Sequence, residues 1–250
     1  MLKPKKMSIS KCIFSFFLFL FSLAIFAQET KKDSLITPVK TERYGLRIGI
    51  DAFKLARSFY EDDYRGLEIV GDYRLTKNYY LAAEIGNENK TKNDDRVNFT
   101  TSGTYFKVGF DYNAYENWLD MENLIYVGLR FGASTFTQEL NTYKVYNPNP
   151  YFGETPTITS GRKFDGLSAQ WGEFVAGVKA EMFSNFYAGF SFRINYLIAN
   201  KEPSGFDNLY IPGFNKTYEG KFGVGFNYTL SYFIPIYKKK IQPKAEESKK

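Results

Sequence analysis

Glu68 and Glu84 are the carboxylates of this chain most suited by position to chemistry. A turn at 76–78 is expected to join the strands that carry them, and a register with Tyr73 opposite Tyr79 places Glu68 directly across from Glu84. Two carboxylates so close raise the pKa of one of them, which general acid–base catalysis requires. The alternative is a structural network in which Arg47 or Lys107 neutralises the pair. We favour that alternative, because structural ion-pair networks also perturb carboxylates that have no catalytic role.

The residue types that are missing limit the chemistry further. The chain has no histidine, and its single cysteine, Cys12, lies in a segment expected to be removed. Ser-His-acid hydrolysis, Cys-His chemistry and imidazole-bound zinc are therefore excluded. We predict no enzyme and no cofactor. A lipid-modifying membrane enzyme that works without histidine is the third of the functions considered.

Two further motifs carry little chemistry. Asn93, Asp94 and Asp95 offer oxygen ligands for Ca²⁺, but their spacing matches no EF-hand loop, so we expect a solvated loop tip. Gly223 and Gly225 lie inside an alternating strand that no helix follows, and they therefore do not indicate a nucleotide loop.

The first 27 residues are predicted to be a secretory signal peptide. They contain four lysines and no acidic residue before an apolar run from Cys12 to Ala27, with cleavage expected between Ala27 and Gln28. The alternative is an uncleaved anchor helix, but the run is shorter than the ~20 residues that span a bilayer.

The positive charge of the chain lies at its two ends. The precursor carries +6, and removal of the four signal lysines leaves 29 basic against 27 acidic residues, or +2. The tail 238–250 holds six lysines and two glutamates, so the body between the ends is about −2. This distribution predicts no binding of nucleic acid.

The body of the chain alternates apolar and polar residues with a period of two. After residue 27 it contains 41 Phe, Tyr and Trp, although the mean hydropathy is only −0.37. Such a pattern is typical of strands with one apolar face. We predict an all-β fold, an eight-stranded antiparallel transmembrane up-and-down β-barrel. The eight segments are 44–52, 67–74, 79–86, 105–112, 125–132, 173–182, 186–196 and 221–232.

The connections alternate between short and long. Turns at 76–78 and 183–185 and a moderate connection at 113–122 alternate with polar stretches at 53–65, 87–103, 134–169 and 198–217. This layout is typical of a barrel in the outer membrane of Gram-negative bacteria, with both ends of the chain in the periplasm. The predicted parts are a signal peptide at 1–27, a periplasmic segment at 28–42, the barrel at 43–237 and a charged tail at 238–250.

Aromatic residues near the short-turn ends of the strands predict a girdle at the membrane boundary. A soluble, lipocalin-like barrel with the two faces reversed is the alternative architecture. The expected girdle residues are Tyr44, Tyr73, Tyr79, Tyr112, Phe186 and Tyr232.

The polar face carries charges of both signs in nearly equal number, which predicts a structural network of ion pairs inside the barrel. Eight strands leave little room beyond these side chains, so the charged lumen argues against an open pore. The expected lumen residues are Arg47, Arg74, Lys107, Arg130, Lys179 and Arg193 with Asp51, Glu68, Asp72, Glu84, Asp111, Glu173 and Glu181.

Aromatic residues in the two longest polar stretches are candidates for recognition at the cell surface. They could equally pack against one another and close the mouth of the barrel, and the sequence leaves both interpretations open. These residues are Tyr143, Tyr146, Tyr151, Phe152, Phe206, Tyr210 and Phe214.

Four stretches of the chain resemble an uncharacterised family of small bacterial outer-membrane β-barrel proteins. The resemblance implies the location and the fold and supplies no catalytic residues. The chain also looks like the outer-membrane-protein-A type of barrel, except that a charged tail follows its last aromatic residues. The stretches are TERYGLRIGIDAFKLARSFYEDDYRGLEIVGDYRLTKNYYLAAEIGNENKT, GTYFKVGFDYNAYENWLDMENLIYVGLRFG, VYNPNPYFGE and DNLYIPGFNKTYEGKFGVGFNYTLSYFIPIYKK.

These observations together predict a barrel without enzymatic activity, with a structural or surface-interaction role or as an accessory of an envelope complex. Its expected partners are the lipid of the outer membrane and a protein bound through the extracellular loops. A narrow channel for small solutes is the first alternative function.

Overall fold

The computed structural model describes residues 41–115, 122–149, 151, 153, 155–205, 207–215 and 220–240. The predicted signal peptide and tail residues 241–250 lie outside these ranges, as do Phe152 and Phe206. The first strand begins at Thr41 and the last ends at Lys240, so the strands extend slightly beyond the range 43–237 expected for the barrel.

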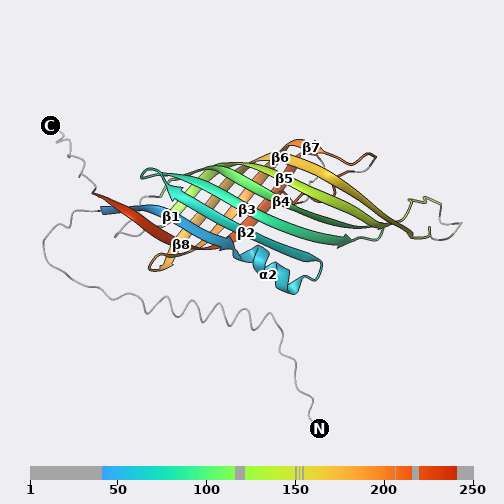
Figure 1. Ribbon diagram of the computed structural model, residues 1–250, viewed down its shortest axis with the longest axis horizontal. Helices are drawn as coiled ribbons and strands as arrows, with labels where there is room; N and C mark the ends of the chain where they lie inside the picture. The colour runs from blue at the N-terminus through green and yellow to red at the C-terminus, as the bar shows by residue number, and fades with distance from the viewer. Residues whose placement is uncertain are drawn as a thin grey trace, which may run out of the picture. The chain divides into compact units, whose positions relative to one another are not determined.

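Eight antiparallel strands form a closed barrel in which each strand pairs with its neighbours in the chain and β8 pairs with β1 (Figure 1). This arrangement confirms the predicted up-and-down topology. One helix of nine residues, α2, follows β1 within the described part of the chain. The elements are β1 Thr41–Asp51, α2 Ala52–Tyr60, β2 Tyr64–Arg74, β3 Tyr79–Asn93, β4 Val97–Asn113, β5 Leu124–Tyr143, β6 Ile158–Phe183, β7 Phe186–Lys201 and β8 Phe222–Lys240.

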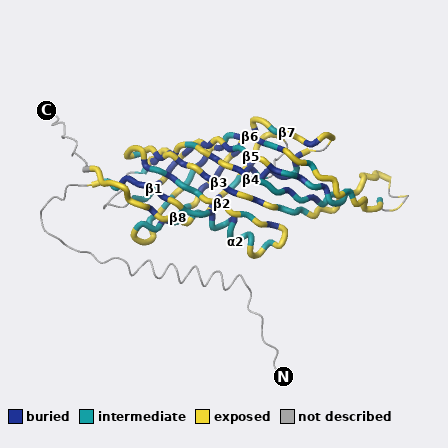
Figure 2. The backbone as a smooth tube through the Cα atoms, in the orientation of Figure 1, coloured by how far each residue is buried: buried dark blue, intermediate teal, exposed yellow. Residues whose placement is uncertain are grey.

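The two faces of the barrel wall differ as the alternation predicts, and Figure 2 shows buried and exposed residues succeeding each other along the strands. Large apolar side chains point outward; Leu129 is 67% exposed and Ile85 is 61% exposed. Charged side chains such as Lys107 and Glu173 point inward, and each is 2% exposed. The lipocalin-like alternative is therefore wrong, because that architecture buries its apolar face inside.

Two of the predicted long loops are largely strand. The hairpin of β3 and β4 continues to the pair Asn93 and Asn98, so most of 87–103 is paired backbone. Strands β5 and β6 likewise continue to the pair Tyr143 and Ile158. The outward residues of the β3–β4 extension are Asn, Thr and Ser, so no apolar phase marks it. Backbone hydrogen bonds between strands need no such phase.

Helix α2 occupies part of the predicted loop 53–65. Asp51 ends β1 and caps the helix by accepting hydrogen bonds from the backbone N–H groups of Phe53 and Lys54. The helix packs mainly on β2 and β8, which extend beyond the end of β1. There the Ser58 hydroxyl bonds both the N–H and the C=O of Gly66 in β2. The helix therefore covers strand edges that β1 leaves unpaired.

Of the six predicted girdle residues three are exposed, Tyr73 and Phe186 are partly buried, and Tyr44 is buried. Tyr79, Tyr112 and Tyr232 point outward and are 42–52% exposed, and the rings of Tyr79 and Tyr112 lie 5.2 Å apart. Tyr44 is only 5% exposed and stacks on Tyr237 at 5.1 Å, so the prediction is wrong for this residue. A bulge in the pairing of β1 with β8 next to Tyr44 breaks the alternation on which the prediction depended.

Candidate functional site: a filled lumen and its mouth

The expected pairing of Glu68 with Glu84 is wrong by two residues. Glu68 lies opposite Gly86, and Glu84 lies opposite Val70. The turn 76–78 is flanked by Leu75 and Tyr79, whose backbone groups are hydrogen-bonded, and this pairing shifts the register from the expected one. The two carboxylates instead share a cation, since the Lys107 ammonium is 3.7 Å from Glu68 and 3.4 Å from Glu84.

Arg193 is the centre of the ion network in the lumen. Its guanidinium donates to both carboxylate oxygens of Glu84, at 2.7 and 2.9 Å, and to Glu173 at 3.1 Å. The Lys107 ammonium is 3.4 Å from Glu173, which closes a ring of alternating charges. Arg130 extends the ring by its contact with Glu84 at 3.7 Å, and it donates to Asp111 at 2.8 Å.

A second layer of ion pairs lies nearer the short turns. Asp72 accepts hydrogen bonds from Arg47 at 2.9 Å and from Lys179 at 2.6 Å. The Arg47 guanidinium also lies over the rings of Tyr80 and Tyr187, at 5.3 and 4.9 Å. These contacts satisfy the buried charges with partners of opposite sign and with aromatic faces.

The remaining predicted lumen residues lie at the two ends of the network. Arg74 forms an ion pair with Glu42 at 3.2 Å, and Glu181 pairs with Arg43 at 3.3 Å. At the opposite end Asp51 accepts from the Asn227 amide. The lumen charges predicted from the sequence therefore all have partners inside or at the rim of the barrel.

Lys54 and Glu88 are network residues that the sequence reasoning missed. The Lys54 ammonium reaches into the lumen from α2 and lies 2.7 Å from Glu68, 2.9 Å from Glu88 and 2.5 Å from the Tyr105 hydroxyl. Glu88 continues the inward phase of Glu84, so a longer β3 would have revealed it. Lys54 could have been found from the cap residue Asp51, which marks the start of a helix.

The loop between β7 and β8 folds into the mouth of the barrel. The Tyr210 hydroxyl donates to Glu88 at 2.7 Å, and the backbone N–H of Gly213 donates to the same carboxylate at 3.0 Å. Burial and the neighbouring Glu88 raise the pKa of Tyr210, so the hydroxyl keeps its proton. Phe214 is 0% exposed and meets the ring of Trp171 edge-on at 5.8 Å. The interpretation of Tyr210 and Phe214 as recognition residues is therefore wrong. Both side chains pack inside the barrel and close its mouth.

Gly213 shows why this loop can approach so closely. Its φ is +80°, which favours glycine, and a Cβ at this position would lie 2.5 Å from the ring of Tyr105. On the other side of the loop, Gln138 of β5 donates to the Asp207 carbonyl at 3.1 Å and accepts from the Leu209 N–H at 3.0 Å. The loop is thus attached to two strands.

The described aromatic side chains at the tip of the β5–β6 hairpin are exposed to solvent. Tyr146 is 65% exposed and Tyr151 is 87% exposed, beside the exposed Val145. The Arg96 guanidinium, from the β3–β4 hairpin, lies 4.5 Å from the centre of the Tyr146 ring. Tyr143 is partly buried at the end of β5. Tyr146 and Tyr151 thus stay candidates for recognition.

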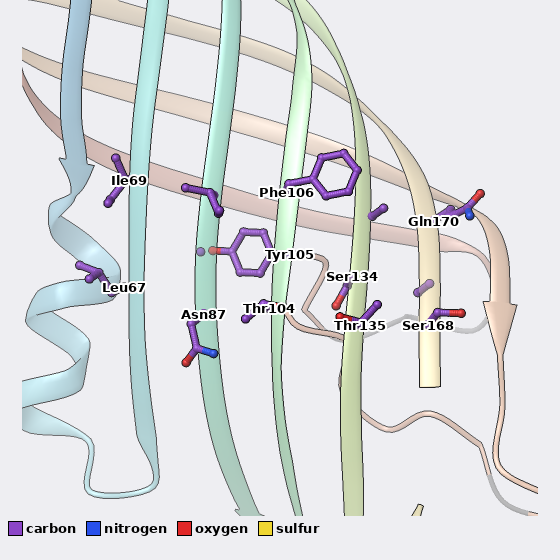
Figure 3. Close-up of a pocket in the computed structure, with 14 residues that line it drawn as sticks. Leu67, Ile69, Asn87, Thr104, Tyr105, Phe106, Ser134, Thr135, Ser168 and Gln170 are labelled. Atoms are coloured by element: carbon purple, nitrogen blue, oxygen red, sulfur yellow. The ribbon is translucent and has the colours of Figure 1, made fainter. Parts of the chain in front are cut away.

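A hollow of about 560 Å³ lies in the outer wall of the barrel. Figure 3 shows its labelled residues spread over neighbouring strands, with Leu67 and Ile69 at one side and Ser168 and Gln170 at the other. Its outward-pointing lining residues include Leu67, Ile69, Ile85 and Phe106, whereas Tyr105 and Ala169 are buried, and no charged side chain is among the described lining residues. The hollow is therefore mostly an outer apolar surface, and it reaches the lumen network at Tyr105, whose hydroxyl donates to Glu68.

Neither a metal cluster nor a spanning helix is found in the described ranges. No group of three or more Asp, Glu or Cys side chains is arranged there to hold a metal ion, and the Asn93–Asp95 tip forms none. Among the described residues no helix is long and apolar enough to cross a membrane.

A closed eight-stranded barrel with apolar side chains outside and paired charges inside belongs to the class of small membrane-spanning β-barrels. The chain itself belongs to the family DUF6048, described as a domain of unknown function, whose family model matches residues 9–239.

Two further similarities are more limited. A segment of 86 residues is 31% identical to DELTA-stichotoxin-Hcr4a of Radianthus crispa, over 33% of this chain and 45% of that protein, so less than half of the toxin is matched. The attachment invasion locus protein Ail of Yersinia pestis is similar in structure with a TM-score of 0.38 and 11% identity, over 76% of this chain and 97% of Ail. Neither similarity is extensive enough to assign the fold or the function of this chain.

Proposed function

We propose that this protein is an outer-membrane β-barrel that serves as a closed scaffold and presents the β5–β6 hairpin to a partner outside the cell. The single observation that carries the proposal is the filled lumen. Arg193, Lys107 and the carboxylates around them occupy its middle, while Lys54 and Phe214 occupy its mouth.

The same observation argues against the two alternatives. A solute crossing the barrel would have to separate ion pairs that are almost completely buried, and removing one partner from such a pair costs several kcal/mol. General acid–base catalysis needs a carboxylate that gains and loses a proton during the reaction. Glu68 and Glu84 are instead held as ions, because both lie beside the Lys107 ammonium. A scaffold needs neither an open path nor a free carboxylate.

The location is supported by the chain and the barrel together. The predicted signal peptide directs the chain out of the cytoplasm, and the outward apolar side chains with their aromatic girdle match the requirements of a bilayer. The extended hairpins lie at the end of the barrel opposite the short turns, which is the extracellular end in barrels of this kind.

Fractionation of cells that express the full chain tests the location. We expect the protein in the outer-membrane fraction, with a gel mobility that changes on boiling, and no conductance in planar bilayers. Recovery as a soluble periplasmic protein would contradict the location. A steady conductance would support the channel instead.

Replacement of Tyr146 and Tyr151 by alanine tests the surface role. We expect binding of the purified barrel to whole cells or envelope fractions to fall about tenfold or more, because exposed aromatic residues dominate recognition surfaces. The free energy of unfolding should change by less than about 0.5 kcal/mol, since both side chains are exposed.

Phe183 provides the matched control for the tyrosine variants. It is an aromatic residue 74% exposed at the short-turn end of the barrel, so Phe183→Ala should leave the binding unchanged. Equal binding by the wild type and the double tyrosine variant would remove the hairpin tip from the proposal and leave a purely structural scaffold.

A further inference from the structure

A pocket of about 390 Å³ lies at the barrel mouth, bordered by helix α2, strand β3 and the loop between β7 and β8. We call it the mouth pocket. Its lining is strongly positive: Arg57 comes from α2, Lys90 and Lys92 come from β3, and Glu61 is the only acidic residue among the described lining residues. Lys54 at its inner side is already bound to Glu68 and Glu88, as described above.

The carboxylates near the mouth pocket do not neutralise all of its cations. Glu61 receives the Arg57 guanidinium at 2.7 Å and has the Lys90 ammonium at 4.0 Å. The hydrogen bond from Arg57 is the main cause that lowers the pKa of Glu61, so this carboxylate stays charged and engaged with Arg57. Lys92 pairs with Asp94, which does not line the pocket.

Of the cations in the mouth pocket, Lys90 has the most distant carboxylate partner. Arg57 and Lys92 repel its ammonium, while Glu61 and Glu88 attract it. The distance of 4.0 Å to Glu61 is at the limit of an ion pair, and that carboxylate already serves Arg57. An anion bound beside Lys90 would therefore relieve a repulsion that the protein itself leaves in place.

Aromatic and apolar side chains complete the pocket. The Arg57 guanidinium lies 4.0 Å from the centre of the Tyr64 ring, and the Lys90 ammonium lies 5.8 Å from Tyr64 and 5.9 Å from Tyr210. These rings hold the cations in place by cation–π contacts. Phe99 and Leu209 contribute apolar wall. Mixed linings with a few convergent polar groups are typical of small-molecule sites, and barrel mouths often hold them.

We propose that the mouth pocket binds a small organic anion, one that carries a carboxylate or phosphate group and a short apolar part. The anionic group would lie between Arg57, Lys90 and Lys92, and the apolar part would pack on Phe99 and Leu209. This site goes beyond the surface role proposed above and does not involve the hairpin tip, so either proposal can fail without the other.

Calorimetric titration of the full-length folded barrel tests the proposal with butyl phosphate, pentanoate and, as the cationic control, butylammonium. We expect both anions to bind, more weakly as salt is added, and butylammonium to produce no binding signal. Lys90→Gln should weaken anion binding about tenfold or more, as expected for the loss of a hydrogen bond to a charged group. Lys163→Gln, at an exposed lysine of β6, should leave it unchanged.

Arg57→Gln is the second variant, and the heat-dependent gel shift establishes that each variant is folded. Binding of butylammonium as strong as that of the anions would overturn the proposal. So would wild-type anion binding by both the Lys90 and the Arg57 variant. Binding of only one of the two anions supports the site and identifies the acidic group that it selects.

Discussion

Replacement of Arg193 by methionine is expected to lower the free energy of unfolding by about 3–5 kcal/mol. The guanidinium makes three hydrogen bonds of 2.7–3.1 Å, to Glu84 and Glu173, and all three side chains are at most 6% exposed. Methionine fills a similar volume but leaves two buried carboxylates with less positive charge. Removal of one partner from a buried network costs far more than the network itself contributes.

Urea titration of the barrel folded in phospholipid vesicles measures this loss, provided that the slope of the transition stays constant. Lys163→Met is the matched control, because the Lys163–Asp165 pair is more than half exposed and should contribute less than about 1 kcal/mol. Addition of Glu84→Gln to the Arg193 variant should recover part of the loss. If the Arg193 variant loses no more than the control, the network does not hold the lumen together.

Replacement of Glu88 by alanine is expected to release the loop that closes the mouth. Glu88 accepts from the hydroxyls of Tyr64 and Tyr210, at 3.0 and 2.7 Å, and from the Gly213 N–H at 3.0 Å. Each hydrogen bond to a charged group contributes ~1.5–3 kcal/mol, so exchange of the Gly213 amide hydrogen should accelerate by roughly ten- to a hundredfold or more. Lys54 keeps Glu68 as its partner.

Hydrogen exchange followed by mass spectrometry resolves the effect on this loop, and planar-bilayer recording shows whether the barrel opens. We expect the conductance to stay at zero, because the ring of Arg193, Lys107 and their carboxylates still fills the lumen below the mouth. Glu202→Ala, at an exposed glutamate near the start of the same loop, should change neither observable. Unchanged exchange at Gly213 in the Glu88 variant would mean that the packing of Phe214 alone holds the loop. A new conductance would mean that the loop is a gate, and it would revive the channel.

The sequence by itself determined the wall of the barrel. Side chains alternate between the two faces of a strand with a period of two, so the apolar phase of Leu129 and Phe131 and the charged phase of Arg130 can be read without a fold. The same rule placed Lys107, Glu173 and Arg193 inside. Where the outward phase became polar, as in 87–103, the alternation lost its contrast and strands were mistaken for loops.

Only the tertiary structure decided what the inward residues meet. The register of β2 on β3 depends on how the turn closes, and a shift of two residues leaves every side chain on its predicted face, so the alternation could not detect the error at Glu68. The closing of the mouth depends on Tyr210 reaching Glu88, which lies 122 residues earlier in the chain. Local patterns carry no information about such a contact. It exists because the closed barrel brings β3 and the loop after β7 to one rim, where Glu88 offers an acceptor and a glycine lets the backbone approach.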